Sequence, residues 1–232
     1  MSKLNKTLLI ILIIIIPLII LLANFKLTAF NFNFYEKEFI KYNVYENENL
    51  KEYSKEDINK ATKELIFYLG AVYSSNNKNL TTNFFDEKEK LHLVDVKSMI
   101  QVITFGLTSL LSIFFLILFY LIYKKDVKAI SNSFIFGSIL SLIFILILFF
   151  IILANFSNAF DKFHIVTFSN NLYLLNPEVD NLINLFPIEF FYDITKRIFI
   201  NSIITSIILL IFGVILKIKK EKFIKMYFLS KL

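Results

Sequence analysis

The sequence contains no cysteine and only two histidines, His92 and His164, among its 232 residues. Without cysteine, this chain cannot form disulfides, thiolate metal sites or a cysteine-linked lipid anchor. The two histidines belong to no HExxH-type motif, and joining them with Asp95 or Asp180 would give a site that no metal-binding spacing supports. A Gly-x-Ser-x-Gly nucleophile motif is also missing, so a covalent acyl-enzyme is not indicated. We therefore predict neither a metal nor a cofactor.

Charged residues are absent from the middle of the long apolar runs, which argues against a proton pump or an ion transporter. With 56% hydrophobic residues and 28 phenylalanines, the chain is too apolar for a soluble domain. Four runs are long enough to cross about 30 Å of hydrocarbon: Thr7 to Ala23, Met99 to Tyr123, Phe134 to Ala154, and Ile198 to Leu216. The first run could be a cleaved signal peptide, but no small-x-small site follows it, so we expect an anchor.

The lysines predict the orientation of these spans. Eleven of them lie in the two tails and in the short loop after the second run, where Asp126 and Glu221 are the acidic residues: Lys3, Lys6, Lys124, Lys125, Lys128, Lys217, Lys219, Lys220, Lys222, Lys225 and Lys231. Basic loops face the cytoplasm, so both termini are predicted there and the two longer polar segments outside. The formal net charge of +6 then reflects topology and contact with anionic membrane lipid, and it indicates no nucleic-acid partner.

The predicted fold is an all-α membrane protein with four transmembrane helices and a mostly helical extracytoplasmic cap. Residues 1–23 form a cytoplasmic tail and the first span, 24–98 an extracytoplasmic region, and 99–154 the second and third spans with a short cytoplasmic loop. Residues 155–197 form the cap, and 198–232 the fourth span with a basic tail. Small residues in the spans, such as Gly106, Gly137 and Ser141, predict close helix packing.

Two local patterns stand out in region 24–98. Phe30, Phe32 and Phe34 alternate with asparagines, which predicts an aromatic contact with the lipid interface or, less often, a short extended piece. Ser54 with Asp57 resembles a capping box, and an apolar stripe at Ile58, Ala61, Leu65 and Leu69 follows before Gly70. This second pattern predicts a helix from Ser54 to Gly70 that packs one face on its surroundings. The polar run from Ser74 to Asn83 predicts a loop.

The cap sequence has two prolines, Pro177 and Pro187, that are suited to the first turn of a helix. We expect two short helices on the membrane surface. Helical spacing would then place Val179, Leu182, Ile183 and Phe186 on the bilayer and Glu178, Asp180 and Asn181 towards water.

The histidines lie just outside the second and third spans, on the same predicted side of the membrane. Asp86 and Glu89 are placed to start a helix that runs into the second span and carries His92 about two turns outside the bilayer. Asp95 follows three residues later, close enough to orient the imidazole, although a solvated pair on a surface helix has the same spacing. Two histidines at this level are suited to act as base and acid on a lipid headgroup or ester. One histidine at the end of each of two membrane helices could also ligate one b-type haem, which we consider a minor alternative, and a non-enzymatic membrane scaffold is a third interpretation.

Two stretches carry a family resemblance: FFDEKEKLHLVDVK, and HIVTFSNNLYLLNPEVDNLINLFPIEFF. They resemble the lipoprotein intramolecular transacylase family of bacterial membrane proteins, which shows a histidine before Asp-Val-Lys, a second histidine, an Asn, Pro-x-x-Asp and Pro-x-x-Phe-Phe. The family's functional histidines fall on His92 and His164, and its Pro-x-x-Asp on Pro177 and Asp180. Tyr173 stands where the family has Trp, Asn176 where it has Asp, and Thr167 replaces one of two neighbouring aromatics, which affects substrate fit more than reaction type.

The resemblance implies an acyl shift from the diacylglyceryl group to the free amino group of the same N-terminal cysteine of a lipoprotein, in the bacterial plasma membrane. The site would lie at the outer leaflet, with diacylglyceryl-cysteine lipoproteins and membrane lipid as partners. One of His92 and His164 is expected to act as base. The other would donate a proton to the glycerol oxygen or stabilise the oxyanion, helped by polar groups at Asp95, Asn170, Asn171 or Tyr173. Pro177, Asp180 and Pro187 are expected to shape the cap.

Overall fold

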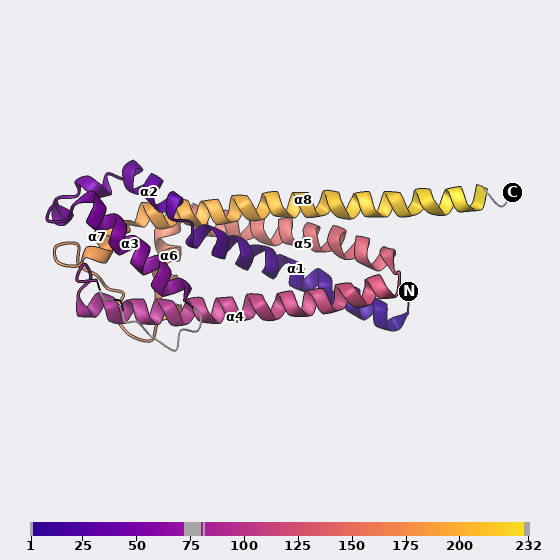
Figure 1. Ribbon diagram of the computed structural model, residues 1–232, viewed down its shortest axis with the longest axis horizontal. Helices are drawn as coiled ribbons and strands as arrows, with labels where there is room; N and C mark the ends of the chain where they lie inside the picture. The colour runs from indigo at the N-terminus through magenta and orange to yellow at the C-terminus, as the bar shows by residue number, and fades with distance from the viewer. Residues whose placement is uncertain (1, 72–79, 81, 230–232) are drawn as a thin grey trace. The chain divides into compact units, whose positions relative to one another are not determined.

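The computed structural model describes residues 2–71, 80 and 82–229, and of residues 221–229 only the backbone. Every regular element among them is a helix (Figure 1): α1 (Lys3–Ala29), α2 (Phe32–Lys41), η1 (Val44–Glu46), η2 (Glu48–Leu50), α3 (Lys55–Gly70), α4 (Glu87–Tyr123), α5 (Val127–Ala154), α6 (Phe156–Thr167), α7 (Asn181–Leu185) and α8 (Ile188–Leu229). Four of them, α1, α4, α5 and α8, are long and apolar enough to cross a membrane. The predicted all-α membrane fold with four spans is confirmed. Most of the loop predicted at Ser74 to Asn83 lies outside the described residues.

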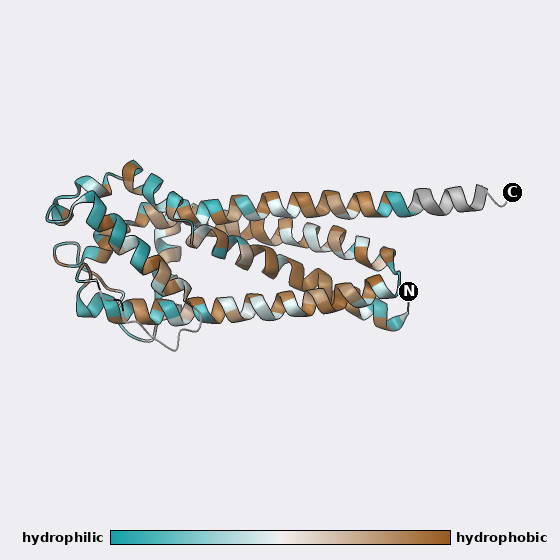
Figure 2. Ribbon diagram, viewed as in Figure 1, coloured by the Kyte–Doolittle hydropathy of each residue, from teal (hydrophilic) through white to brown (hydrophobic). Residues whose placement is uncertain are grey.

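The chain divides into two compact units. The first contains Met1–Phe25, Gly106–Ile151 and Ile198–Leu232, and the second contains Lys26–Phe105 and Ile152–Arg197. Figure 2 shows long apolar stretches along the membrane helices, whereas α2 and α3 alternate between polar and apolar residues. The histidine-bearing segments predicted as functional belong to the second unit.

Small residues bring the helices of the first unit close together. A Cβ atom added at Gly137 in α5 would meet the Ile16 side chain of α1 at 2.7 Å, and one at Gly213 in α8 would meet the Phe134 side chain of α5 at 2.9 Å. Ser141 is fully buried beside them. Close packing at α5 was therefore predicted correctly, but Gly106 in α4 has no neighbour within 4 Å of an added Cβ.

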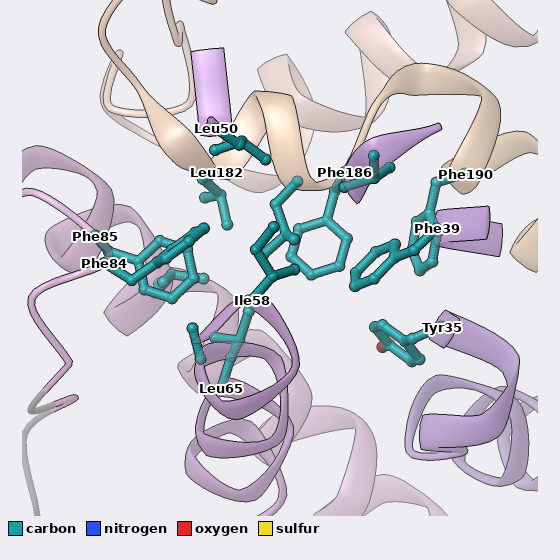
Figure 3. Packing of buried hydrophobic residues seen from close by; sticks show 14 of the residues in the cluster. Tyr35, Phe39, Leu50, Ile58, Leu65, Phe84, Phe85, Leu182, Phe186 and Phe190 are labelled. Atoms are coloured by element: carbon teal, nitrogen blue, oxygen red, sulfur yellow. The ribbon is translucent and has the colours of Figure 1, made fainter. Parts of the chain in front are cut away.

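An aromatic core holds the second unit together (Figure 3). Phe39 of α2, Phe186 at the end of α7 and Phe190 of α8 are buried, with ring centroids 5.1 to 6.2 Å apart. The α2 helix was not predicted: the Phe30–Phe34 alternation was neither an extended piece nor, at Phe34, a lipid contact, because Phe34 is buried in this core. Burial against protein has overridden the local pattern.

The α3 helix agrees with the prediction. Ser54 is its N-cap and forms a reciprocal capping box with Asp57, and the helix ends at Gly70. Its Ile58, Ala61 and Leu65 side chains are buried in the core. Here the side-chain cap and the apolar stripe act together, so the local sequence was sufficient.

The segment around the two prolines differs from its prediction. Only one short helix forms, α7, and it begins at Asn181; Pro187 instead precedes α8, a long membrane helix. Leu182 and Phe186 pack into the aromatic core instead of lying on the bilayer, and Asp180 is buried instead of facing water. Protein therefore covers Leu182 and Phe186 of the predicted apolar face, Ile183 is half-buried, and Val179 is 71% exposed.

Candidate functional site

Reciprocal caps fix the start of α4 and thereby the position of His92. Asp86 Oδ1 accepts a hydrogen bond from the Glu89 backbone N–H at 2.7 Å, and Glu89 Oε2 accepts one from the Asp86 N–H at 2.7 Å. This satisfies two donors that a helix N-terminus leaves open. The helix then continues unbroken to Tyr123, as predicted, and His92 lies on its polar first part, before the apolar run that begins at Met99.

Helix α6 presents His164. Asn155 caps this helix by accepting a hydrogen bond from the Asn158 N–H at 3.3 Å. One turn before its end, the His164 Nδ1 atom lies 2.8 Å from the Phe160 carbonyl oxygen. A carbonyl oxygen only accepts, so the bond requires a proton on Nδ1 and leaves a lone pair on Nε2 of the neutral ring.

The structure brings the two histidines together. Their ring centroids are 6.3 Å apart, with the ring planes inclined by 33°. His92 is buried, with 6% of its surface exposed, and His164 is half-buried. Both imidazoles can therefore reach one small group placed beside them.

Aromatic rings surround the histidine pair. Phe168 lies 5.1 Å from His92 and 5.7 Å from His164, centroid to centroid. Tyr173 lies 5.1 Å from His164 at an inclination of 31°, and Phe160 lies 4.4 Å from it. Phe168 was not among the predicted site residues. An apolar wall of this kind excludes water and fixes both imidazole planes.

Burial keeps His92 neutral. Its Nδ1 atom is buried and has no hydrogen-bond partner. Burial, together with the nearby His164, lowers the pKa of His92 to about 4, although the charge of Asp95 opposes the shift. His92 is therefore in its uncharged form at neutral pH.

Asp95 contacts the loop after α6 instead of the imidazole that it was expected to orient. Its Oδ2 atom accepts a hydrogen bond from Asn170 Nδ2 at 2.8 Å, and Asn170 Oδ1 accepts one from the Leu172 N–H at 3.0 Å. Asn171 is exposed, and its carbonyl oxygen accepts from the Leu174 N–H at 3.1 Å. Asp95 thus acts on His92 only through charge, while it fastens the loop that carries Tyr173.

Lys88 and Glu89, which precede His92 on α4, also bind the segment between α6 and α8. Lys88 Nζ donates to the Leu174 carbonyl at 2.8 Å and to Asp180 Oδ2 at 3.2 Å. Glu89 Oε1 accepts from the Leu182 N–H at the start of α7, so this buried carboxylate caps two helices. Burial raises the pKa of Glu89. From the sequence, Glu89 could be assigned only to the start of α4, because its contact with the Leu182 N–H is tertiary.

The remaining predicted cap residues, Pro177, Asp180 and Pro187, lie in the same segment between α6 and α8. The Pro177 carbonyl accepts from Asn49 Nδ2 at 2.9 Å and from Asn184 Nδ2 at 2.7 Å. Asp180 also accepts from the Asn176 N–H, and the Pro187 carbonyl accepts from the Phe190 N–H at 2.9 Å. Within the described part of the chain, no group of three or more metal-ligating side chains comes together.

Comparisons with known proteins agree on one family. A family model described as lipoprotein intramolecular transacylase Lit matches residues 10–191. The solved structure of the membrane-integral Lit from Bacillus cereus shares 26% identity with a TM-score of 0.83, covering 96% of this chain and 100% of that one. Two structures of the same bacterial protein, with arginine or alanine in place of one histidine, match at 25% identity and a TM-score of 0.78. They cover 94% of this chain and 94% and 96% of theirs. No curated protein matches the chain significantly.

Proposed function

Because the chain belongs to the lipoprotein intramolecular transacylase family, and is thus a membrane-integral acyltransferase, we propose that His92 and His164 catalyse its acyl transfer as base and acid. The substrate is the N-terminal diacylglyceryl-cysteine of a bacterial lipoprotein, and the product is its lyso form with an N-linked acyl chain. The observation that carries this proposal is the approach of the two histidine rings to 6.3 Å. No other histidine exists in the chain to take either role.

The reaction needs one proton removed and one supplied. The cysteine nitrogen attacks the ester carbonyl carbon, and the C–N bond forms as nitrogen loses a proton. The bond between the carbonyl carbon and the glycerol oxygen then breaks, and that oxygen takes up a proton. Both reacting groups belong to one substrate, so the enzyme gains most by folding the substrate onto itself. An amine of pKa near 8 requires only a base of modest strength.

His164 is the better candidate for the base. Its Nδ1–H donates to the Phe160 carbonyl, which directs the Nε2 lone pair away from the helix. The Phe160 and Tyr173 rings, with centroids 4.4 and 5.1 Å from that of His164, hold that direction. A base held in one tautomer and one orientation loses little entropy when the amine proton is transferred.

His92 then donates to the departing glycerol oxygen or stabilises the oxyanion. Neutral imidazole still carries one N–H, so the low pKa of His92 does not prevent donation. The hydrogen bond between Asp95 and Asn170 holds the loop that places Tyr173 against His164. The exposed Asn171 can contact substrate. Lys88, Glu89 and Asp180 anchor the far end of this loop, while Pro177 and Pro187 shape the chain around α7.

The lysine distribution supports a topology with both termini in the cytoplasm and the histidines at the outer leaflet of the plasma membrane. Lipoproteins are anchored there, so substrate and surrounding membrane lipid are the expected partners. Because membrane topology accounts for the basic residues, we propose no nucleic-acid partner.

Conversion of a synthetic diacylglyceryl lipopeptide tests the proposal. The purified protein should yield an N-acylated lyso peptide of unchanged mass, whose fragment ions locate one acyl chain on nitrogen. An unchanged fragment pattern with folded protein would refute transacylation. The alternative of haem ligation is disfavoured because Phe168 borders both rings, at 5.1 and 5.7 Å, where a macrocycle would need room. A Soret band would revive it, and an intact cell phenotype after alanine replacement of both histidines would favour the non-enzymatic scaffold.

A further inference from the structure

Helix α6 leaves three of its apolar side chains largely exposed. None of its residues is buried, and Phe163, Ile165 and Val166 are 45%, 65% and 85% exposed. Exposed apolar side chains in such density on one short helix mark an interaction surface.

Phe163 and Val166 lie on one face of the helix, which the half-buried Ala159 continues, whereas Ile165 lies about 100° away from Val166. At 100° per residue, Ala159, Phe163 and Val166 share one side, whereas Asp161 lies on the opposite side. A third side carries His164, which points to His92. The Ala159–Phe163–Val166 face is therefore separate from the histidine pair, and it contains no charge.

Phe156 and His164 of α6 contact α8 and α4 at similar distances from the apolar runs of those two helices. The Phe156 ring contacts Tyr192 at 5.5 Å, and His164 lies 6.3 Å from His92. Tyr192 precedes Ile198 by six residues and His92 precedes Met99 by seven. At 1.5 Å per residue, both contacts fall about 10 Å outside the apolar runs of α8 and α4. These two contacts link α6 to the segments of α8 and α4 that precede their apolar runs, a level where side chains reach the headgroup layer.

The chain enters α6 directly from a membrane span. Only Asn155 separates α5 from α6, and the last turns of α5 expose Ile147, Phe150 and Ile151 by 53%, 67% and 66%. These side chains belong to a helix apolar enough to face lipid. The exposed apolar surface continues along the chain from the span into α6.

We propose that α6 is an interfacial helix whose Ala159–Phe163–Val166 face is covered by the lipid of the adjacent leaflet. The proposal extends the proposed function without depending on catalysis. The helix that carries His164 would then lie at the depth of the lipid ester groups. Substrate would then approach the histidines sideways from the leaflet, with its acyl chains still in lipid.

Spin labelling tests this surface, because the chain has no native cysteine. Val166→Cys and Ala159→Cys are nearly isosteric changes on the proposed face, and Asp161→Cys is the matched control on the opposite side. Each full-length variant carries a nitroxide and is reconstituted in phosphatidylcholine vesicles with anionic phosphatidylglycerol. Phe150→Cys in α5 supplies the lipid-facing reference.

Collision with dissolved oxygen and with a water-soluble nickel chelate reports the surroundings of each label. At Val166 and Ala159, oxygen should relax the label at least several-fold more than the chelate relative to Asp161, approaching the Phe150 reference. Chelate-dominated relaxation at both positions would show water there and overturn the proposal. Dipolar broadening at Val166 would overturn it too, because a second copy of the chain would then cover the face. No turnover is needed, so a failure of the proposed function cannot be mistaken for a failure here.

Discussion

Replacing the histidines singly and together measures whether they act in one transition state. A positioned acid or base contributes about 10²- to 10⁴-fold to a rate. Because the two rings lie 6.3 Å apart and share Phe168 as a neighbour, we expect His92→Gln and His164→Gln each to lower kcat by about this factor. The double variant should lose little more. If the two losses were independent, their activation free energies would add. Because the double variant loses about as much as one single variant, the interaction free energy between the two sites would be about 3 to 5 kcal/mol, which corresponds to one 10²- to 10⁴-fold factor.

The assay is conversion of the diacylglyceryl lipopeptide by detergent-purified variants, followed through fragment masses. Glutamine is chosen for the buried His92 because alanine would leave a cavity. Asp95→Asn is the comparison variant: it removes the charge but keeps an oxygen for Asn170, so its loss should stay near 10- to 100-fold. Multiplicative losses in the double variant, or near wild-type turnover in either single variant, would refute the cooperative acid–base mechanism.

Three further predictions concern stability, each checked by reversible unfolding in detergent. Glu89→Ala should cost about 1–3 kcal/mol, because the Leu182 N–H loses its acceptor, while Glu89→Gln keeps an oxygen and should cost less; equal costs would contradict the double cap. The folded protein holds His92 neutral with a pKa of about 4, whereas the unfolded chain takes up a proton near pH 6.5. Stability should therefore fall by about 2 kcal/mol between pH 7 and pH 5, and His92→Gln should abolish that part of the pH dependence. Gly213→Ala should cost about 1–3 kcal/mol, since its Cβ would meet a side chain at 2.9 Å; Gly106→Ala, with nothing within 4 Å, should be neutral or slightly stabilising.

The features that could be predicted from the sequence are those whose causes are local. Hydrophobic length gave the four spans, and the Ser54–Asp57 capping box gave the start of α3. The beginning of α4 at Asp86 and Glu89 follows from the same kind of pattern. In each case, the interacting groups lie within one helical turn or one continuous run of chain, so no knowledge of the tertiary fold is required.

What could not be predicted is which surroundings cover an amphipathic face. The segment with Leu182 and Phe186 and helix α6 have similar patterns, yet protein buries the former and leaves Val166 of the latter uncovered. Periodicity reports that one face is apolar, but lipid and a protein core satisfy it equally well. For the same reason, the partner of Asp95 was misjudged: Asn170, far away in sequence, competes successfully with the histidine one turn along the helix.

The unbroken course of α4 makes the histidine site sensitive to helical phase. From Glu87 to Tyr123 the helix has no interruption that could absorb a twist. Inserting one residue after Ser98 would therefore rotate His92 by about 100° relative to the spanning part of the same helix. If the spanning part of α4 kept its orientation in the lipid, His92 would then point away from His164. Inserting seven residues, about two turns, returns His92 to within about 20° of its original direction. The site should therefore tolerate insertions of whole pairs of turns with respect to the direction of His92, although such insertions change its height above the membrane.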